Sequence, residues 1–251
     1  MNNKVALGVI LGIVVVIAGV IFMMSRPIDT AENNNFNSGS EQSENIEVGG
    51  RAVFSVTDAA ADMGAVSEIN MQITSVEVYN ATSGWTTVST TPRVFNLLDL
   101  KARNESELLA DADLQSGTYD QIRLMVNSVA VKTKAGAIKI AKLPSNQLLI
   151  NSNLVVTADK TSSINFDFLA DKSLHTTSKG EYVFAPVVKT ETRSSSEVTI
   201  TASGVVNING GNVDDMKTVG MDIDGSMKTN FQLKSGQKLN INSSNVIELG
   251  L

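Results

Sequence analysis

The stretch Gly117-Thr118-Tyr119-Asp120-Gln121-Ile122-Arg123-Leu124-Met125-Val126 decides the fold of this chain. Apolar side chains recur in it at every second position, at Ile122, Leu124 and Val126. The opposite face carries Tyr119, Gln121 and Arg123. This alternation is typical of a β-strand that lies with one face on a core and the other in water.

Short runs of the same kind stand on both sides of this stretch, rich in Val, Ile, Thr and Phe and separated by Gly, Asn and Ser. The chain after residue 50 has no long segment with a helical period. We predict strands over 52–57, 67–79, 86–88, 94–98, 118–126, 128–132, 137–142, 148–157, 163–169 and 182–190. The predicted fold class is therefore all-β.

Two places depart from simple alternation. In the run 67–79, apolar residues occupy odd positions up to Ile73 but even positions from Val76 onward, which predicts a bulge or a change of sheet near Thr74-Ser75. The segment 104–110 carries the one helix signal after residue 50, because Asn104 can cap a first turn and Glu107 stands at the reciprocal capping position.

Residues 193–251 predict a second, smaller β unit, in which Asp224-Gly225 is the dipeptide of a tight hairpin. A segment of about 60 residues forms only a marginal core of its own. We therefore expect this unit to pack on a larger β-sandwich formed by residues 51–192. Its predicted strands cover 198–209, 218–224, 227–233 and 239–248.

Residues 5–24 read VALGVILGIVVVIAGVIFMM and contain no polar side chain. At about 1.5 Å per residue such a helix is about 30 Å long, the thickness of the hydrocarbon core of a bilayer. The run ends in Phe22-Met23-Met24, where cleavage by signal peptidase requires small residues. We expect a transmembrane helix that is retained and contacts the lipid bilayer, with cleavage as the alternative.

The flanks of residues 5–24 predict the topology. Lys4 in the tail 1–4 favours a cytoplasmic N-terminus, which places everything after the helix outside the cytoplasm. Segment 25–50 is rich in Asn, Ser, Gly and Glu, and this composition predicts an acidic, disordered tether.

The composition excludes several classes of site. The chain has no Cys, which rules out a disulfide framework, a thiolate zinc site and attachment through a lipidated cysteine. The single His, His175, cannot form a histidine-rich metal centre, and its polar surroundings predict a solvated loop. With a net charge of -6 and no Lys/Arg cluster, nucleic acid is not an expected partner. We expect neither a metal nor a cofactor.

Ligand binding through an aromatic side chain is the most specific site hypothesis. Trp85 follows the apparent hairpin tip 80–84, where an exposed indole can stack on a sugar ring or anchor a protein. The competing interpretation is a Trp buried in the core of the sandwich. Asp58 and Asp62, which flank a turn after the first strand, are additional ligand-binding candidates.

Carboxylates are the remaining candidates for catalysis, since hydrolysis of a glycosidic bond needs two acids that converge in a cleft. The acids that could do so, beside Trp85, are Asp58, Asp62, Asp111, Asp113, Asp167, Asp222 and Asp224. Three Asn-X-Ser/Thr sequons mark candidate glycosylation sites at Asn80, Asn104 and Asn242.

Six short motifs, in this order, resemble the family of the domain of unknown function numbered 4382 over about residues 50–192. They are Val56-Thr57-Asp58-Ala59, Gly84-Trp85, Phe95-Asn96-Leu97-Leu98-Asp99-Leu100, Leu114-x-x-Gly117-x-Tyr119-x-Gln121-Ile122-Arg123-Leu124, Phe166-Asp167-Phe168 and Pro186-Val187-Val188. The resemblance implies an envelope-attached domain with an immunoglobulin-like or transthyretin-like β-sandwich, and it supplies no catalytic residues.

These observations together predict a single-pass membrane protein with a non-catalytic module outside the cytoplasm. The expected role is structural or interactive, through binding of a cell-envelope protein or glycan. An envelope hydrolase acting on carbohydrate through loop carboxylates is the alternative.

Overall fold

The computed structural model of the protein describes residues 48–59 and 63–250, which belong to one compact unit. The predicted transmembrane helix 5–24 and nearly all of the predicted tether lie outside the described residues. Within the described ranges, no helix has the length and the apolar character needed to cross a membrane.

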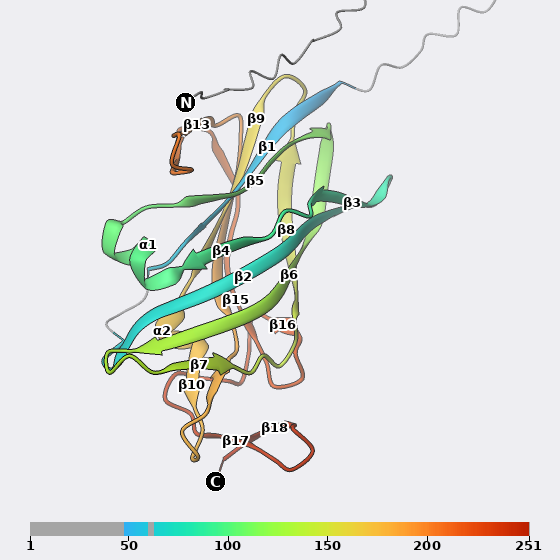
Figure 1. Ribbon diagram of the computed structural model, residues 1–251. Helices are drawn as coiled ribbons and strands as arrows, with labels where there is room; N and C mark the ends of the chain where they lie inside the picture. The colour runs from blue at the N-terminus through green and yellow to red at the C-terminus, as the bar shows by residue number, and fades with distance from the viewer. Residues whose placement is uncertain (1–47, 60–62, 251) are drawn as a thin grey trace, which may run out of the picture. The chain divides into compact units, whose positions relative to one another are not determined.

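Two six-stranded sheets form the body of this unit (Figure 1). The first sheet has the order β16-β15-β12-β9-β1-β5. Its strands are β16 (Met227–Lys228), β15 (Asn212–Met221), β12 (Val187–Ser194), β9 (Thr161–Phe168), β1 (Gly49–Thr57) and β5 (Glu107–Gln115). Strand β1 pairs in parallel with β9 and antiparallel with β5, so the first described strand lies inside the sheet.

The second sheet has the order β3-β2-β6-β7, with β4 also pairing β2 and β8 also pairing β6. Its strands are β3 (Gly84–Ser89), β2 (Val66–Asn80), β6 (Gly117–Thr133), β7 (Ile138–Ala141), β4 (Arg93–Asn96) and β8 (Gln147–Val156). Three two-stranded ribbons complete the β structure. They are β10 (Leu174–Thr176) with β11 (Tyr182–Phe184), β13 (Glu197–Ile200) with β14 (Val206–Asn209), and β17 (Leu239–Ile241) with β18 (Ile247–Leu249).

One hydrophobic core joins the inner faces of both sheets. Phe54 of β1 and Phe166 of β9 come from the first sheet, and Ile69 of β2 and Leu124 of β6 come from the second, all with no exposed surface. The all-β prediction is confirmed, since the only helices in the described residues are the short α1 (Leu97–Arg103) and α2 (Ala170–Ser173).

The predicted irregularity in β2 is confirmed. The pairing of β2 with β6 shifts register on both sides of Ile73, and this lets Met71 and Val76 both point into the core. A second irregularity was not predicted. The pairing of β6 with β8 shifts between Tyr119 and Gln121, so Tyr119 turns inward and is only 2% exposed.

The helix predicted over 104–110 is wrong. The helix lies just before this segment, and Asn104 is its C-terminal cap, with a left-handed φ of 52°. Residues from Glu107 onward form β5 instead, because the apolar run Leu108-Leu109-Ala110 extends along the edge of the first sheet. Asn favours both ends of a helix, and the sequence pattern does not separate the two.

The C-terminal segment adds strands to the first sheet. Strand β15 pairs with β12 along its length, and Val219 and Met221 of β15 enter the shared core. The hairpin predicted at Asp224-Gly225 is confirmed, with Gly225 at a φ of 80° in the turn between β15 and β16.

Candidate functional site

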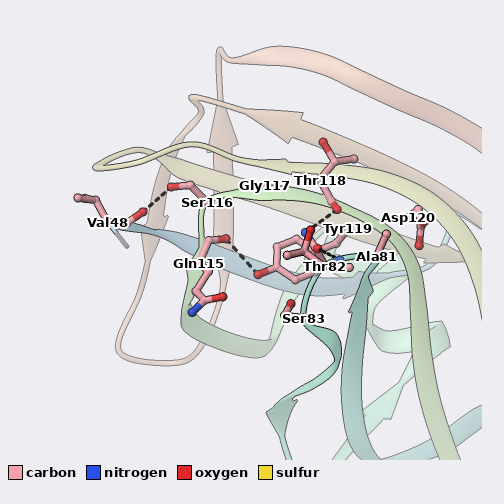
Figure 2. Close-up of a pocket in the computed structure, with 11 residues that line it drawn as sticks. Val48, Ala81, Thr82, Ser83, Gln115, Ser116, Gly117, Thr118, Tyr119 and Asp120 are labelled. Carbon is pink, nitrogen blue, oxygen red and sulfur yellow. Dashed lines mark hydrogen bonds between the residues drawn. The ribbon is translucent and has the colours of Figure 1, made fainter. Parts of the chain in front are cut away.

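A hollow of about 580 Å³ opens where two turns meet at one end of the unit (Figure 2). Residues 80–83 come from the end of β2 and the turn into β3, and residues 115–120 come from the end of β5, the connecting residue Ser116 and the start of β6. Val48, just before β1, closes a third side. Most of the residues that line the hollow have uncharged polar side chains, and these suit a ligand that carries hydroxyl or amide groups beside apolar surface.

Asn80 ties the two turns together. Its amide Nδ2 donates to the carbonyl oxygen of Thr118 at 3.0 Å, and its Oδ1 accepts from the backbone N–H of Thr82 at 2.7 Å. The second contact forms an Asx turn, a common local use of Asn. Gly117 lies against this side chain, since a Cβ at Gly117 would stand 2.8 Å from Asn80 Nδ2.

The other wall of the hollow is held by two further side-chain contacts. The Tyr119 hydroxyl donates to the carbonyl oxygen of Gln115 at 3.0 Å, and the Ser116 hydroxyl donates to that of Val48 at 2.5 Å (Figure 2). The chain thus fixes the walls of the hollow before any ligand binds.

Trp85 lies on the outer face of the second sheet, not in the core. It is 38% exposed and pairs across strands with Tyr79, with ring centroids 5.4 Å apart and planes tilted by 56°. The guanidinium of Arg123 lies 4.1 Å from the centre of the Trp85 ring, and its Nε binds Glu77 at 2.5 Å. We call Trp85, Tyr79, Arg123 and Glu77 the aromatic platform.

The platform and the hollow use neighbouring parts of the same strands. Tyr79 precedes Asn80 at the end of β2, and Gln121, the cross-strand partner of Tyr79, follows Asp120 of the hollow. An aromatic face beside polar groups is the combination that sugar rings require, because one face of a sugar is apolar and its rim carries hydroxyl groups.

The other two predicted ligand-binding residues lie elsewhere. Asp58 follows β1 and is 4% exposed, and its Oδ1 accepts from the backbone N–H of Ala170 at the start of α2 at 3.2 Å. This contact ties the two elements together and leaves little surface for a ligand. Asp62 lies outside the described residues.

The remaining acids are spread over three places in the fold: Asp111 and Asp113 on β5, Asp167 on β9, and Asp222 and Asp224 between β15 and β16. Asp111 forms a two-pronged ion pair with Arg51, with Oδ1 2.9 Å from Nε and Oδ2 2.8 Å from Nη2. Asp222 and Asp224 share Lys228 in the hairpin between β15 and β16, and hydrogen bonding to Lys228 lowers the pKa of Asp224.

Asp167 on β9 is the acid of this set whose pKa is raised. Burial raises the pKa, and a hydrogen bond from the backbone of Ala59 and the nearby cations Lys189 and Lys101 offset that effect only in part. None of these contacts includes a residue of the aromatic platform. In the described part of the chain, no three residues among His, Asp and Glu gather closely enough to hold a metal ion.

The structure distinguishes the three sequons. Asn80 and Asn242 are half-buried, and the Nδ2 of Asn242 donates to Glu248 Oε1 at 2.6 Å. Asn104 is exposed at the end of α1.

His175 was predicted in a solvated loop, and this prediction is wrong. His175 lies in β10, is 3% exposed, and neither ring nitrogen has a hydrogen-bond partner in the described structure. Burial lowers its pKa. The polar residues around His175 misled the prediction, because they lie beside a short strand, β10, whose one buried position is His175 and whose partner β11 carries the buried Val183 and Phe184.

Three platform residues, Tyr79, Arg123 and Glu77, were not identified from the sequence as site residues. Tyr79 lies in β2 and Arg123 lies in β6, and apolar residues precede or flank both of them along the chain. Only the pairing register of the strands brings them to Trp85. The alternation in β6 does place Arg123 on the wet face, and this is the signal that could have identified it.

Comparison with known proteins gives one match. A family described as Domain of unknown function (DUF4382) matches residues 49–186, which confirms the resemblance noted in the sequence. The searches of curated proteins and of solved structures found no match.

Proposed function

The chain belongs to the DUF4382 family, and on the basis of its exposed aromatic platform we propose that it is a non-catalytic recognition module of the cell envelope. Its ligand is a glycan or a protein of the envelope. The N-terminal helix holds the module at the membrane, with the described unit outside the cytoplasm.

The single observation that carries this proposal is the position of Trp85. A Trp buried in the core stabilises the fold, whereas Trp85 keeps part of its apolar surface exposed on the outer face of a sheet. Arg123 and Tyr79 hold its ring in place, so little side-chain entropy is lost on binding. Large, rigid and partly polar side chains of this type dominate binding energies at recognition surfaces.

We favour a glycan over a protein as the ligand. Most of the residues that line the hollow beside the platform carry hydroxyl or amide side chains, and its one carboxylate is that of Asp120. Neutral groups of this kind can bind sugar hydroxyls as donors and as acceptors. A protein partner is the second candidate, since Trp and Arg also anchor protein interfaces.

The non-catalytic part of the proposal is supported by the distribution of the carboxylates. Asp58 is tied to α2, Asp111 to Arg51, and Asp222 and Asp224 to Lys228. Hydrolysis of a glycosidic bond needs two acids on either side of one bond. As to fold, the two sheets on one core support an immunoglobulin-like or transthyretin-like sandwich.

Binding can be tested with residues 46–251, which include all the described residues. An array of envelope glycans and an envelope protein extract are each probed with the unaltered segment and with Trp85→Ala. We expect Trp85→Ala to weaken binding at least tenfold while leaving the unfolding temperature nearly unchanged, since the side chain packs outside the core.

Val94→Ala is the matched control. Val94 is also an exposed apolar residue of the second sheet, at 58% exposure, and its truncation should leave binding unchanged. Equal binding by Trp85→Ala and the unaltered segment would refute the platform as the site. Binding to protein without glycan would replace the favoured ligand by the second one.

The topology is tested separately. Protease added to intact cells should remove the residues after the tether. A tag fused to the N-terminus should survive the treatment, because it lies on the cytoplasmic side. Full protection in intact cells, with digestion after rupture, would show that the unit lies inside the cytoplasm.

A further inference from the structure

We infer that the folded protein has one acceptor for N-linked glycan, Asn104, and that the other two sequons are closed by their own hydrogen bonds. The inference rests on the proposed function in one respect, because only a unit outside the cytoplasm meets the transferase. The substrate class is an oligosaccharide carried on a lipid pyrophosphate.

Asn104 presents a free amide. The residue is exposed, and no hydrogen bond to its side chain exists in the described structure. Its backbone is fixed, since its N–H donates to the carbonyl oxygen of Lys101 at 3.1 Å and ends the helix. Among residues 48–59 and 63–250, the hydroxyl of Ser106, the third residue of the sequon, likewise has no hydrogen-bond partner.

The charged neighbours of Asn104 satisfy one another. Arg103 pairs with Asp99 at 3.0 Å and with Glu107 at 3.5 Å, and it also contacts Glu105. None of these groups turns to the Asn104 amide. The sequon therefore stands at a helix end whose side chains do not compete for its acceptor nitrogen.

Asn80 and Asn242 differ at the reacting atom. In Asn80 the amide nitrogen donates to Thr118, and in Asn242 it donates to Glu248. Both side chains also use Oδ1, in Asn80 for Thr82 and in Asn242 for the backbone N–H groups of Ser244 and Val246. A transferase would have to break these contacts before it could turn the amide into its active site.

The chemistry explains why these contacts matter. The amide nitrogen attacks C1 of the first sugar, a bond forms between Nδ2 and C1, and the bond from C1 to the pyrophosphate oxygen breaks. The amide gives up one proton to solvent, and the lipid pyrophosphate departs as the leaving group with the electron pair of the broken bond. Because Nδ2 is the nucleophile, a hydrogen bond that holds Nδ2 against the protein slows the reaction.

The position of Asn104 also leaves the candidate site open. Figure 1 shows α1 on the opposite side of the unit from the β2–β3 tip that forms the hollow. A glycan on Asn80 would fill the hollow itself, since Asn80 lines it. A glycan on Asn104 would be compatible with ligand binding at the platform.

The test uses the full chain in detergent micelles and a purified transferase that requires only Asn-X-Ser/Thr, with its lipid-linked oligosaccharide. A solvated sequon added after Leu251 reports that the enzyme is active. Synthetic peptides 77–85, 101–109 and 239–247 give the rate that each sequon has without the fold. Occupancy at each site is followed by mass spectrometry of proteolytic fragments.

We expect Asn104 to be modified at least tenfold faster than Asn80 and Asn242, after each rate is divided by that of its peptide. Ser106→Ala should abolish the modification without changing Asn104 itself. Glu248→Ala should raise the rate at Asn242, because it removes the acceptor that holds Nδ2 and lies on an exposed residue.

Normalised rates at Asn80 or Asn242 that equal the rate at Asn104 would overturn the inference. An unmodified Asn104 beside a modified added sequon would do so as well. Either result leaves the binding experiment with Trp85→Ala unaffected, so the two proposals fail separately. Conversely, if the protease experiment showed that the unit lies inside the cell, the proposed function would be refuted. The modification rates in micelles would still test whether Asn104 is the acceptor.

Discussion

Single residues in this protein differ in role according to the face of the strand on which they lie. Trp85 and Tyr119 are both aromatic residues of the second sheet, yet Trp85 is exposed and Tyr119 is 2% exposed. A shift of one residue in the pairing near Tyr119 reverses its direction. The direction of a side chain therefore depends on the register of its strand as well as on its place in the alternation.

The buried His175 predicts a pH-dependent stability. Its pKa in the folded state is lowered from the ordinary value of 6.5, so the unfolded chain binds a proton first as the pH falls. The free energy of unfolding should therefore decrease below about pH 6.5, by at most about 1.4 kcal/mol per pH unit. Urea unfolding at a series of pH values between 7.5 and 5 measures the slope.

The control for this slope is His175→Gln, which keeps a polar side chain that does not titrate. His175 is the only His in the chain, so the variant should lose the slope near pH 6. Asp167, whose raised pKa gives a slope of opposite sign at lower pH, is present in both proteins and cancels in the difference. Identical slopes in the two proteins would show that His175 titrates alike when folded and unfolded.

At the scale of elements, the strands were more predictable than their ends and connections. Alternation identified β2 and its bulge, because each inward residue of the run 67–79 is apolar. It did not identify β5, whose residues 107–115 mix acids with apolar residues because one side of the strand faces water. Nor did the sequence show that one unbroken strand, β6, would cover two predicted ones.

The cap of α1 gives a prediction about backbone conformation. Asn104 adopts a φ of 52°, which Gly tolerates and β-branched residues do not. We expect Asn104→Gly to leave the free energy of unfolding unchanged or slightly raised, and Asn104→Val to lower it by about 1 to 2 kcal/mol. Chemical denaturation of the unglycosylated protein checks both values.

A cost for Asn104→Val no greater than that for Asn104→Gly would contradict this account of the cap. Asn104→Gly and Asn104→Val also serve as controls in the glycosylation experiment, because both variants remove the acceptor nitrogen. Only the valine variant should lower the free energy of unfolding.

For the whole molecule, the first sheet is completed by residues far apart in the chain. Strand β1 lies between β9 and β5, and β15 from the C-terminal segment covers the far side of β12. The sequence predicted contact between the C-terminal segment and the larger sandwich. The addition of its strands to the same sheet depends on long-range pairing, which local patterns do not encode.

Removal of the C-terminal segment is expected to prevent stable folding. A chain that ends at Thr192 would expose the backbone edge of β12 and lose Val219 and Met221 from the core. Exposed edges of this type promote aggregation. We expect residues 46–192 to aggregate or to lack a cooperative transition, and residues 46–251 to unfold in one transition seen alike by tryptophan fluorescence and circular dichroism.

A soluble 46–192 segment with its own sharp transition would contradict this prediction and would establish the boundary near residue 192 as that of an independent domain.

The candidate site was harder to predict from the sequence than the sheets were. Trp85 could be singled out as an isolated aromatic after a turn, but the hollow arises from two turns that are 35 residues apart in the sequence, as the separation of Asn80 and Gln115 shows.

The placement of β1 has a mechanical consequence. In the proposed topology, a force transmitted from the membrane enters the unit at Val48 and runs along β1, which pairs with β9 from Arg51 to Thr57 and with β5 on its other side. Such a pull shears both ladders at once, so many bonds share the load and must break together. A pull from the C-terminal end would instead open the β17–β18 ribbon one pair at a time. The module is thus built to resist tension from the side on which its anchor is expected.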